Sequence, residues 1–177
     1  MDPVELVTPR LRLRLPDARD TDAVTAACQD PEVQRWVPVP SPYAREHAEQ
    51  WIAGAAESWA RDEELRFVVV DRTGDSLVGA MGLHARSPGM REIGFWTAPG
   101  ARRRGFTVEA ARRICRWGFE DLGLHRVEWL ALVGNEGSRA VAQRAGFVLE
   151  GTLRHGILHR GTPCDAWIAG LLPGDPS

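Results

Sequence analysis

Residues 92–107 read EIGFWTAPGARRRGFT and combine a strand, a turn and the start of a helix. The apolar run predicts a strand over 91–97, and a helix is predicted over about 104–122. Gly105 lacks a Cβ and lets a ligand approach the backbone closely, while the first helical turn offers free N–H groups and the positive dipole end. The segment predicts an anion site or a solvated basic turn that only starts a helix, and the turn alone does not decide between them.

A strand and a short helix follow this segment. HRVEWLALV predicts a strand over 126–133, and NEGSRAVAQRAGF predicts a helix over 136–145. Asn135 is a common N-cap residue, and Gly146 is suited to end the helix. Two further strands, over 147–154 and 164–172, are expected to pair across a turn that contains Gly161.

The first ninety residues contain both kinds of element. Alternating apolar residues in RLRLRL predict a strand over 10–15, followed by a helix to about Cys28 and a helical turn over 31–36. The prolines of VPVPSP exclude regular structure over 37–42, and an amphipathic pattern predicts a helix over 43–61. Strands over 66–70 and 77–83 flank a hairpin turn. We therefore expect a mixed α/β fold with more strands than helices.

Composition predicts one ordinary globular domain over residues 1–177. The chain is 44% hydrophobic and 26% charged, with a net charge of −2, which gives no electrostatic reason to expect nucleic acid or membrane partners. The three cysteines form no CxxC pair, so neither a disulfide framework nor a metal site is expected. The first residues are unlike a signal peptide, and no apolar run reaches about 18 residues. We expect a soluble, cytoplasmic protein.

Two segments resemble the GNAT superfamily of N-acetyltransferases, especially the branch of ribosomal-protein N-terminal (alanine/serine) acetyltransferases. RRRGFT is similar to its pyrophosphate loop, Q/R-x-x-G-x-G/A, and NEGSRAVAQRAGF is similar to the N-x-x-S…GF segment of this branch. VQRWVPVPSPYAREHAEQWI and the ending GTLRHGILHRGTPCDAWIAGLL also look like this branch. The resemblance implies a splayed, mostly antiparallel central sheet flanked by helices.

The resemblance also implies where acetyl-CoA would bind, as the acetyl donor. It would sit between the strands at 91–97 and 126–133, with its pyrophosphate on backbone amides and its pantetheine along a strand edge. Asn135 would otherwise be a plain N-cap, and Ser138 an exposed helix residue. The implied donor-binding residues are Phe95, Trp96, Thr97, Arg102, Arg103, Arg104, Gly105, Phe106, Thr107, Asn135 and Ser138.

Two positions depart from the family pattern. Thr107 stands where a small residue usually closes the pyrophosphate loop, so its side chain either crowds the phosphate or replaces one contact with its hydroxyl. Ala142 stands where many members carry a tyrosine that protonates the leaving thiolate. Ser138 is the candidate for that role, and the alternative is that the thiolate, with an ordinary thiol pKa of about 8.5, needs no side-chain acid.

The resemblance implies direct attack of an amine on the thioester, with the oxyanion stabilised by a backbone N–H near Phe95 or Trp96. The candidate general bases are Glu92, which shares a strand face with Gly94 and Trp96, then His155, then His84. For each of these the alternative is an ordinary surface residue at a strand end.

The expected acceptor is a primary amine. Deprotonation at pH 7 costs about 1 kcal/mol for a peptide α-amine but about 4.6 kcal/mol for a lysine, so a site without a strong base favours a peptide N-terminus or a small amine. Trp36, Trp51 and Trp59 are candidates for a substrate wall, core packing or the contact of a homodimer. The alternatives are a non-catalytic acyl-CoA sensor that binds a partner and an enzyme that uses another donor, such as succinyl-CoA.

Overall fold

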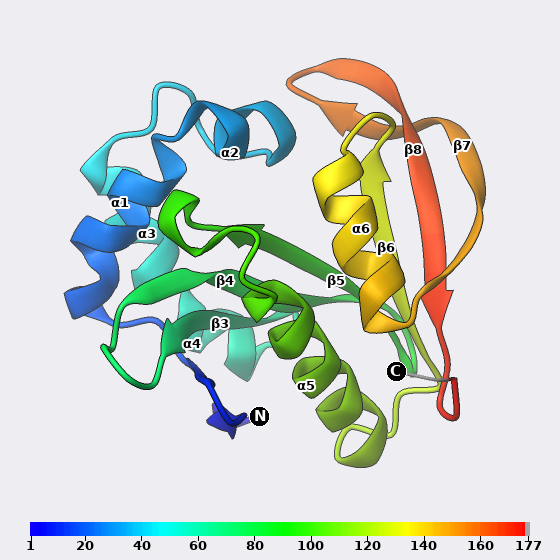
Figure 1. Ribbon diagram of the computed structural model, residues 1–177, viewed down its shortest axis with the longest axis horizontal. Coiled ribbons are helices and arrows are strands. Elements are labelled where there is room, and N and C mark those ends of the chain that lie inside the picture. The colour runs from blue at the N-terminus through cyan, green and yellow to red at the C-terminus, as the bar shows by residue number, and fades with distance from the viewer. Residues whose placement is uncertain (176–177) are drawn as a thin grey trace.

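The computed structural model describes residues 1–175, in which eight strands form one mostly antiparallel sheet with helices on both faces (Figure 1). This confirms the predicted fold class. The strands lie in the order β1-β2-β3-β4-β5-β6-β8-β7. Their bounds are β1 Leu6–Val7, β2 Leu11–Arg14, β3 Glu64–Asp71, β4 Leu77–Ser87, β5 Met90–Thr97, β6 Arg126–Leu132, β7 Val148–His159 and β8 Thr162–Leu171.

The helices fall into an early group and a late pair. The bounds are α1 Thr21–Cys28, α2 Pro31–Trp36, α3 Arg45–Ala53, α4 Ala55–Ala60, α5 Phe106–Glu120 and α6 Glu136–Ala145, with short 3₁₀ turns η1 Ala18–Asp20 and η2 Pro99–Ala101. None of the helices within residues 1–175 combines the length and the apolar character needed to cross a bilayer.

The sheet opens between β5 and β6, which are its parallel pair. They are hydrogen-bonded only from Met90–Arg126 to Ile93–Trp129, so the end of β5, residues 94–97, extends beyond its partner. The crossover helix α5 joins the two strands, because a parallel connection cannot be a tight turn. Figure 1 shows β6, β8 and β7 turned away from β3 to β5, with α2 and α6 on either side of the opening. The split predicted between these strands is therefore present.

Successive residues of each strand point to opposite faces of the sheet, and each face packs into its own hydrophobic core. On β3, Leu65 and Phe67 belong to the large cluster with Ile114 of α5, whereas Val68 packs with Val24 of α1 in the smaller cluster. By the same alternation, Glu92, Gly94 and Trp96 of β5 lie on the face covered by the early helices. The space between that face and these helices is where the site lies.

Three predicted elements were wrong in extent, and one of them is the strand expected over 77–83, which continues to Ser87 as β4. The helix expected over 43–61 is broken at Gly54 into α3 and α4. The break follows from packing, because Ala48 belongs to the smaller core and Trp59 to the larger one, and one straight helix cannot serve both. The strand expected over 147–154 continues to His159, since β7 is bulged near Gly151 and His155, which hides its alternation.

Candidate active site

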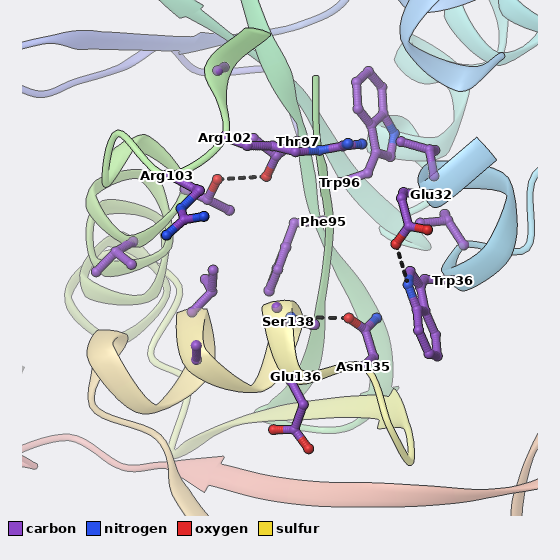
Figure 2. A pocket seen from close by; sticks show the side chains of 18 of the residues that line it. Glu32, Trp36, Phe95, Trp96, Thr97, Arg102, Arg103, Asn135, Glu136 and Ser138 are labelled. Carbon is purple, nitrogen blue, oxygen red and sulfur yellow. Dashed lines mark hydrogen bonds between the residues drawn. The ribbon is translucent and has the colours of Figure 1, made fainter. Parts of the chain in front are cut away.

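A cavity of about 520 Å³ lies at the opening between β5 and β6. We call it the loop cavity, because the turn before α5 forms one wall and the N-terminus of α6 forms the other. Figure 2 shows Arg102 and Arg103 on one side, Asn135 and Ser138 on another, and Glu32 and Trp36 of α2 opposite. Nine of the eleven residues expected to bind the donor line it: Phe95, Trp96, Thr97, Arg102, Arg103, Gly105, Thr107, Asn135 and Ser138.

The start of α5 forms a cradle of backbone amides. Gly105 is the N-cap residue with φ of 76°, a left-handed conformation that glycine adopts without steric cost, and Arg103 has φ of 61°. No side chain of residues 1–175 caps this helix, so the N–H groups of its first turn are free to meet a ligand. The free amides, the helix dipole and Arg103 together favour an anion at this turn.

Arg104 and Phe106 are outside the lining of the loop cavity. Phe106 is buried in the large core with 3% of its surface exposed, and Arg104 stacks on its ring at 4.4 Å. Arg10 covers the same ring at 4.6 Å and donates to the Arg104 carbonyl. The Phe106 side chain is thus withdrawn from a ligand, whereas the Arg104 side chain, which is 55% exposed, lies beside the cavity and helps to hold the turn in shape.

Thr107 connects the turn to the free end of β5. Its Oγ1 lies 2.7 Å from Oγ1 of Thr97, and both residues line the loop cavity. Thr107 departs from the family pattern, and its hydroxyl is thus hydrogen-bonded to another side chain of the protein. The contact fixes the distance between the start of α5 and the unpaired edge of β5.

Asn135 and Ser138 are held by the protein at the opposite wall. The Asn135 side chain caps α6 by accepting from the Ser138 amide at 3.1 Å. The indole Nε1 of Trp129, a core residue of β6, donates to Ser138 Oγ at 3.0 Å. Because Ser138 accepts this bond, its own O–H remains free to donate into the cavity.

A second cavity of about 760 Å³ lies between the sheet and the early helices. We call it the sheet cavity. Trp36 and Trp51 line it, whereas Trp59 is fully buried in the large core against Phe67 and Trp117. The two cavities meet, since they share six lining residues: Trp36, Val37, Phe95, Trp96, Asn135 and Ser138.

The three candidate bases lie in different surroundings. Glu92 lines the sheet cavity, but its Oε2 accepts from the Arg86 guanidinium in an ion pair. His84 lines the same cavity, with Nε2 3.7 Å from Oε1 of Glu64. His155 lies outside both cavities, on an exposed bulge of β7 with φ of 52°, where its amide donates to Asp165. The structure therefore brings Glu92 and His84, but not His155, to the space beside β5.

Asp30, which lines neither cavity, holds the cavity residue Arg102 in place and was missed by sequence reasoning. Its carboxylate caps α2 through the amides of Glu32 and Val33 and also accepts from Arg102 Nη2 at 2.5 Å. This hydrogen bond from Arg102 holds the pKa of Asp30 below its ordinary value. The D-P pair at 30–31 signals a capped helix start, but no local pattern links it to a turn seventy residues later.

We expect the Asp30–Arg102 pair to contribute stability that disappears in acid. A carboxyl whose pKa is lowered by folding stabilises the native state fully above the unfolded value, about 3.9, and ceases to do so as the pH falls through the folded value. Asp30→Asn keeps a capping oxygen and loses the charge, whereas Asp30→Ala also loses the cap, worth about 1 kcal/mol. The free energies of unfolding of the wild type and Asp30→Asn, measured with denaturant from pH 7 to pH 3, should therefore converge below about pH 4. If the difference between the two free energies of unfolding does not change with pH, the Asp30–Arg102 ion pair does not stabilise the fold.

Comparison with known proteins gives consistent matches over most of the chain. Residues 10–148 match the family model for the acetyltransferase (GNAT) domain. The chain is 32% identical over 162 residues to YoaA of Bacillus subtilis, an uncharacterized N-acetyltransferase, covering 90% of this chain and 92% of YoaA. Its structure is similar to that of a Vibrio cholerae protein assigned as a ribosomal-protein-serine acetyltransferase, with a TM-score of 0.88, 29% identity and coverage of 98% and 100%. It shares the fold of RimL, a ribosomal α-N-protein acetyltransferase solved with coenzyme A, with a TM-score of 0.84, 18% identity and coverage of 96% and 98%.

Proposed function

Because the chain belongs to the GNAT acetyltransferase family, we propose that it transfers the acetyl group of acetyl-CoA to a primary amine, and that the acceptor is a peptide or protein N-terminus or a weakly basic small amine. The observation that carries this proposal is the meeting of two cavities beside the unpaired end of β5. One cavity has an anion cradle, and the other has an aromatic wall. A donor and an acceptor entering from the two sides would meet at Phe95 and Trp96.

The donor would lie in the loop cavity. Its pyrophosphate would accept from the free amides of the first turn of α5, with Arg103 adding positive charge. Its pantetheine would run along the edge of β5 that β6 leaves unpaired, because an edge strand offers N–H and C=O groups to an amide-bearing chain. RimL has this fold and was solved with coenzyme A, which supports a donor of this class here.

The thioester would lie where the cavities meet, close to Ser138. An N–H at Phe95 or Trp96 would stabilise the oxyanion that forms when the amine attacks the carbonyl carbon. As the C–S bond breaks, the thiolate would accept a hydrogen bond from the free O–H of Ser138. The six residues shared by the cavities carry no positive charge, so the junction favours an uncharged acetyl group over a succinyl group with its carboxylate.

The acceptor would enter through the sheet cavity. The aromatic wall of Trp36, Trp51 and Trp96 suits the apolar part of a peptide's first residue. The carboxylates that line this cavity suit a cationic amine before it loses its proton. A peptide α-amine meets these requirements at a smaller deprotonation cost than lysine.

Thiol release from acetyl-CoA with a peptide panel tests this function. We expect turnover with peptides whose N-terminus is free, and none with the same peptides when the N-terminus is blocked and a lysine is left free. Mass spectrometry should place one acetyl group on the α-amine. Acetyl-CoA binding without thiol release from any amine would favour a sensor, lysine-only turnover would overturn the α-amine acceptor, and faster reaction with succinyl-CoA would overturn the donor.

A further inference from the structure

Glu64 of β3, His84 of β4 and Glu92 of β5 form a row across three neighbouring strands. The sheet register places Glu64 opposite His84 and His84 opposite Glu92, and all three line the sheet cavity. Directly opposite residues of an antiparallel pair have Cβ atoms about 5 Å apart. An imidazole therefore lies between two carboxylates on the wall of the proposed acceptor site.

Two glycines leave room for this row. A Cβ on Gly94 would lie 2.9 Å from His84 Nε2, and a Cβ on Gly82 would lie 3.0 Å from Glu64 Oε1. The side chains of His84 and Glu64 thus lean over backbone that any larger residue would crowd. His84 Nε2 lies over Gly94, the first residue of β5 after its last pair with β6, so it is next to the opening where the cavities meet.

The two carboxylates of the row have different hydrogen-bond partners. Glu92 Oε2 is bound by Arg86. Oε2 of Glu64 accepts from Arg66, at 3.0 Å from Nε and 2.5 Å from Nη2. Oε1 of Glu64 lies 3.7 Å from His84 Nε2. That distance is too long for a hydrogen bond, so Glu64 does not occupy Nε2, yet it is short enough to stabilise a positive imidazole.

We propose that His84 is the catalytic base that takes the proton from the acceptor amine, and that Glu64 is the positioning residue that stabilises the resulting imidazolium. This inference rests on the proposed function. It replaces Glu92, the leading candidate from the sequence, because Arg86 already binds that carboxylate. The 45% exposure of the His84 side chain lets a substrate amine reach it.

The step balances as an ordinary aminolysis. The amine nitrogen forms a bond to the thioester carbonyl carbon, and Nε2 of His84 takes the proton that this nitrogen loses. The C–S bond then breaks, and the sulfur leaves as a thiolate that accepts a proton and becomes free coenzyme A. The imidazolium returns its proton to solvent, which leaves one acetamide, one thiol and an unchanged enzyme.

The pH dependence follows from the groups around His84. An imidazole base must be neutral to accept a proton, and an ordinary imidazole titrates near pH 6.5, so a histidine base adds its own transition to the acid limb of the rate profile. The titratable and charged groups that line the sheet cavity with His84 are Tyr43, His47 on α3, Glu64 and Arg66 on β3, Glu92 on β5 and His159 on β7, and Arg86 on β4 pairs with Glu92.

Four variants, assayed for thiol release with a peptide acceptor that the wild type acetylates, test the proposal. His84→Gln keeps a polar side chain without basicity and should lower kcat/KM for the acceptor at pH 7 about 100-fold, with one acid-side transition lost and acetyl-CoA affinity unchanged by calorimetry. Glu64→Gln should lower kcat about 10-fold with little change in the KM for the acceptor, because the carboxylate acts on the imidazolium that forms only as the proton moves. Glu92→Gln, which removes a carboxylate already paired with Arg86, should lower kcat/KM less than His84→Gln does and should keep the acid-side transition. His125→Gln, an exposed histidine outside both cavities, is the matched control and should be neutral.

Specific results would contradict the roles proposed for His84 and Glu64, which we call the dyad. If the wild type turns over and His84→Gln keeps its rate and its acid limb, His84 is not the base. A large loss in Glu92→Gln with a normal His84→Gln would return the role to Glu92. A Glu64→Gln variant that raises the KM for the acceptor and leaves kcat unchanged would show that Glu64 does not act on the imidazolium. Absence of thiol release by the wild type itself would instead refute the proposed function and, with it, the dyad.

Discussion

Gly105→Asp is expected to weaken acetyl-CoA binding by about 100-fold or more. The substitution places a carboxylate at the N-cap of α5, where the pyrophosphate of the donor would accept from free amides. Loss of two charge-assisted hydrogen bonds, at about 1.5 kcal/mol each, already accounts for that factor. Calorimetric titration with acetyl-CoA measures the affinity, and the rise in melting temperature that the wild type shows with ligand should disappear.

Gly123→Asp is the matched control for this prediction. Gly123 follows the other end of α5, has φ of 66° and has no heavy atom within 4 Å of a Cβ, so the change introduces the same side chain at a similar backbone angle. It should keep the affinity of the wild type while sharing any loss of stability that a positive φ causes. If both variants bind acetyl-CoA equally well, the donor's phosphates do not lie at Gly105.

The parts of the fold with local signals were predictable. The helix α5, its glycine at the start and the short helix α6 between Asn135 and Gly146 all follow from caps and periodicity in a few residues of sequence. The family, predicted from the two segments around Gly105 and Ser138, is confirmed. These segments line the loop cavity together because each one starts a helix beside the opened strands.

Contacts between distant segments had no such signal. The pair of Asp30 with Arg102 joins α2 to the turn before α5, and the row from Glu64 to Glu92 exists only because three strands take one register. Arg86 is only six residues from Glu92, but their pairing depends on the continuation of β4 to Ser87, beyond the strand end expected at 83. His155 stood out as a lone histidine near a strand, but the bulge that places it outside both cavities depends on pairing with β8.

Ser138→Ala is expected to lower kcat about 100-fold while changing acetyl-CoA affinity less than about 3-fold. The Ser138 hydroxyl accepts from the Trp129 indole, so the proton it can offer points away from that bond. A hydrogen bond to a sulfur that becomes negative strengthens in the transition state, and removing it lowers kcat rather than binding. The factor corresponds to one charged hydrogen bond of about 3 kcal/mol. Steady-state kinetics and calorimetry separate the two quantities.

Trp129→Phe distinguishes a chemical role of Ser138 from a structural one. Ser138→Ala leaves the buried indole N–H without its partner, which alone costs about 1–3 kcal/mol of folding stability. Trp129→Phe breaks the same hydrogen bond but keeps the hydroxyl, so it should share a loss of stability and retain a kcat within about 5-fold of the wild type. If the two variants lose kcat equally, the hydroxyl serves the packing of β6 against α6. If Ser138→Ala alone loses kcat, the hydroxyl acts on the leaving thiolate, and Ser138 takes the role that the tyrosine of other family members would have at the position of Ala142.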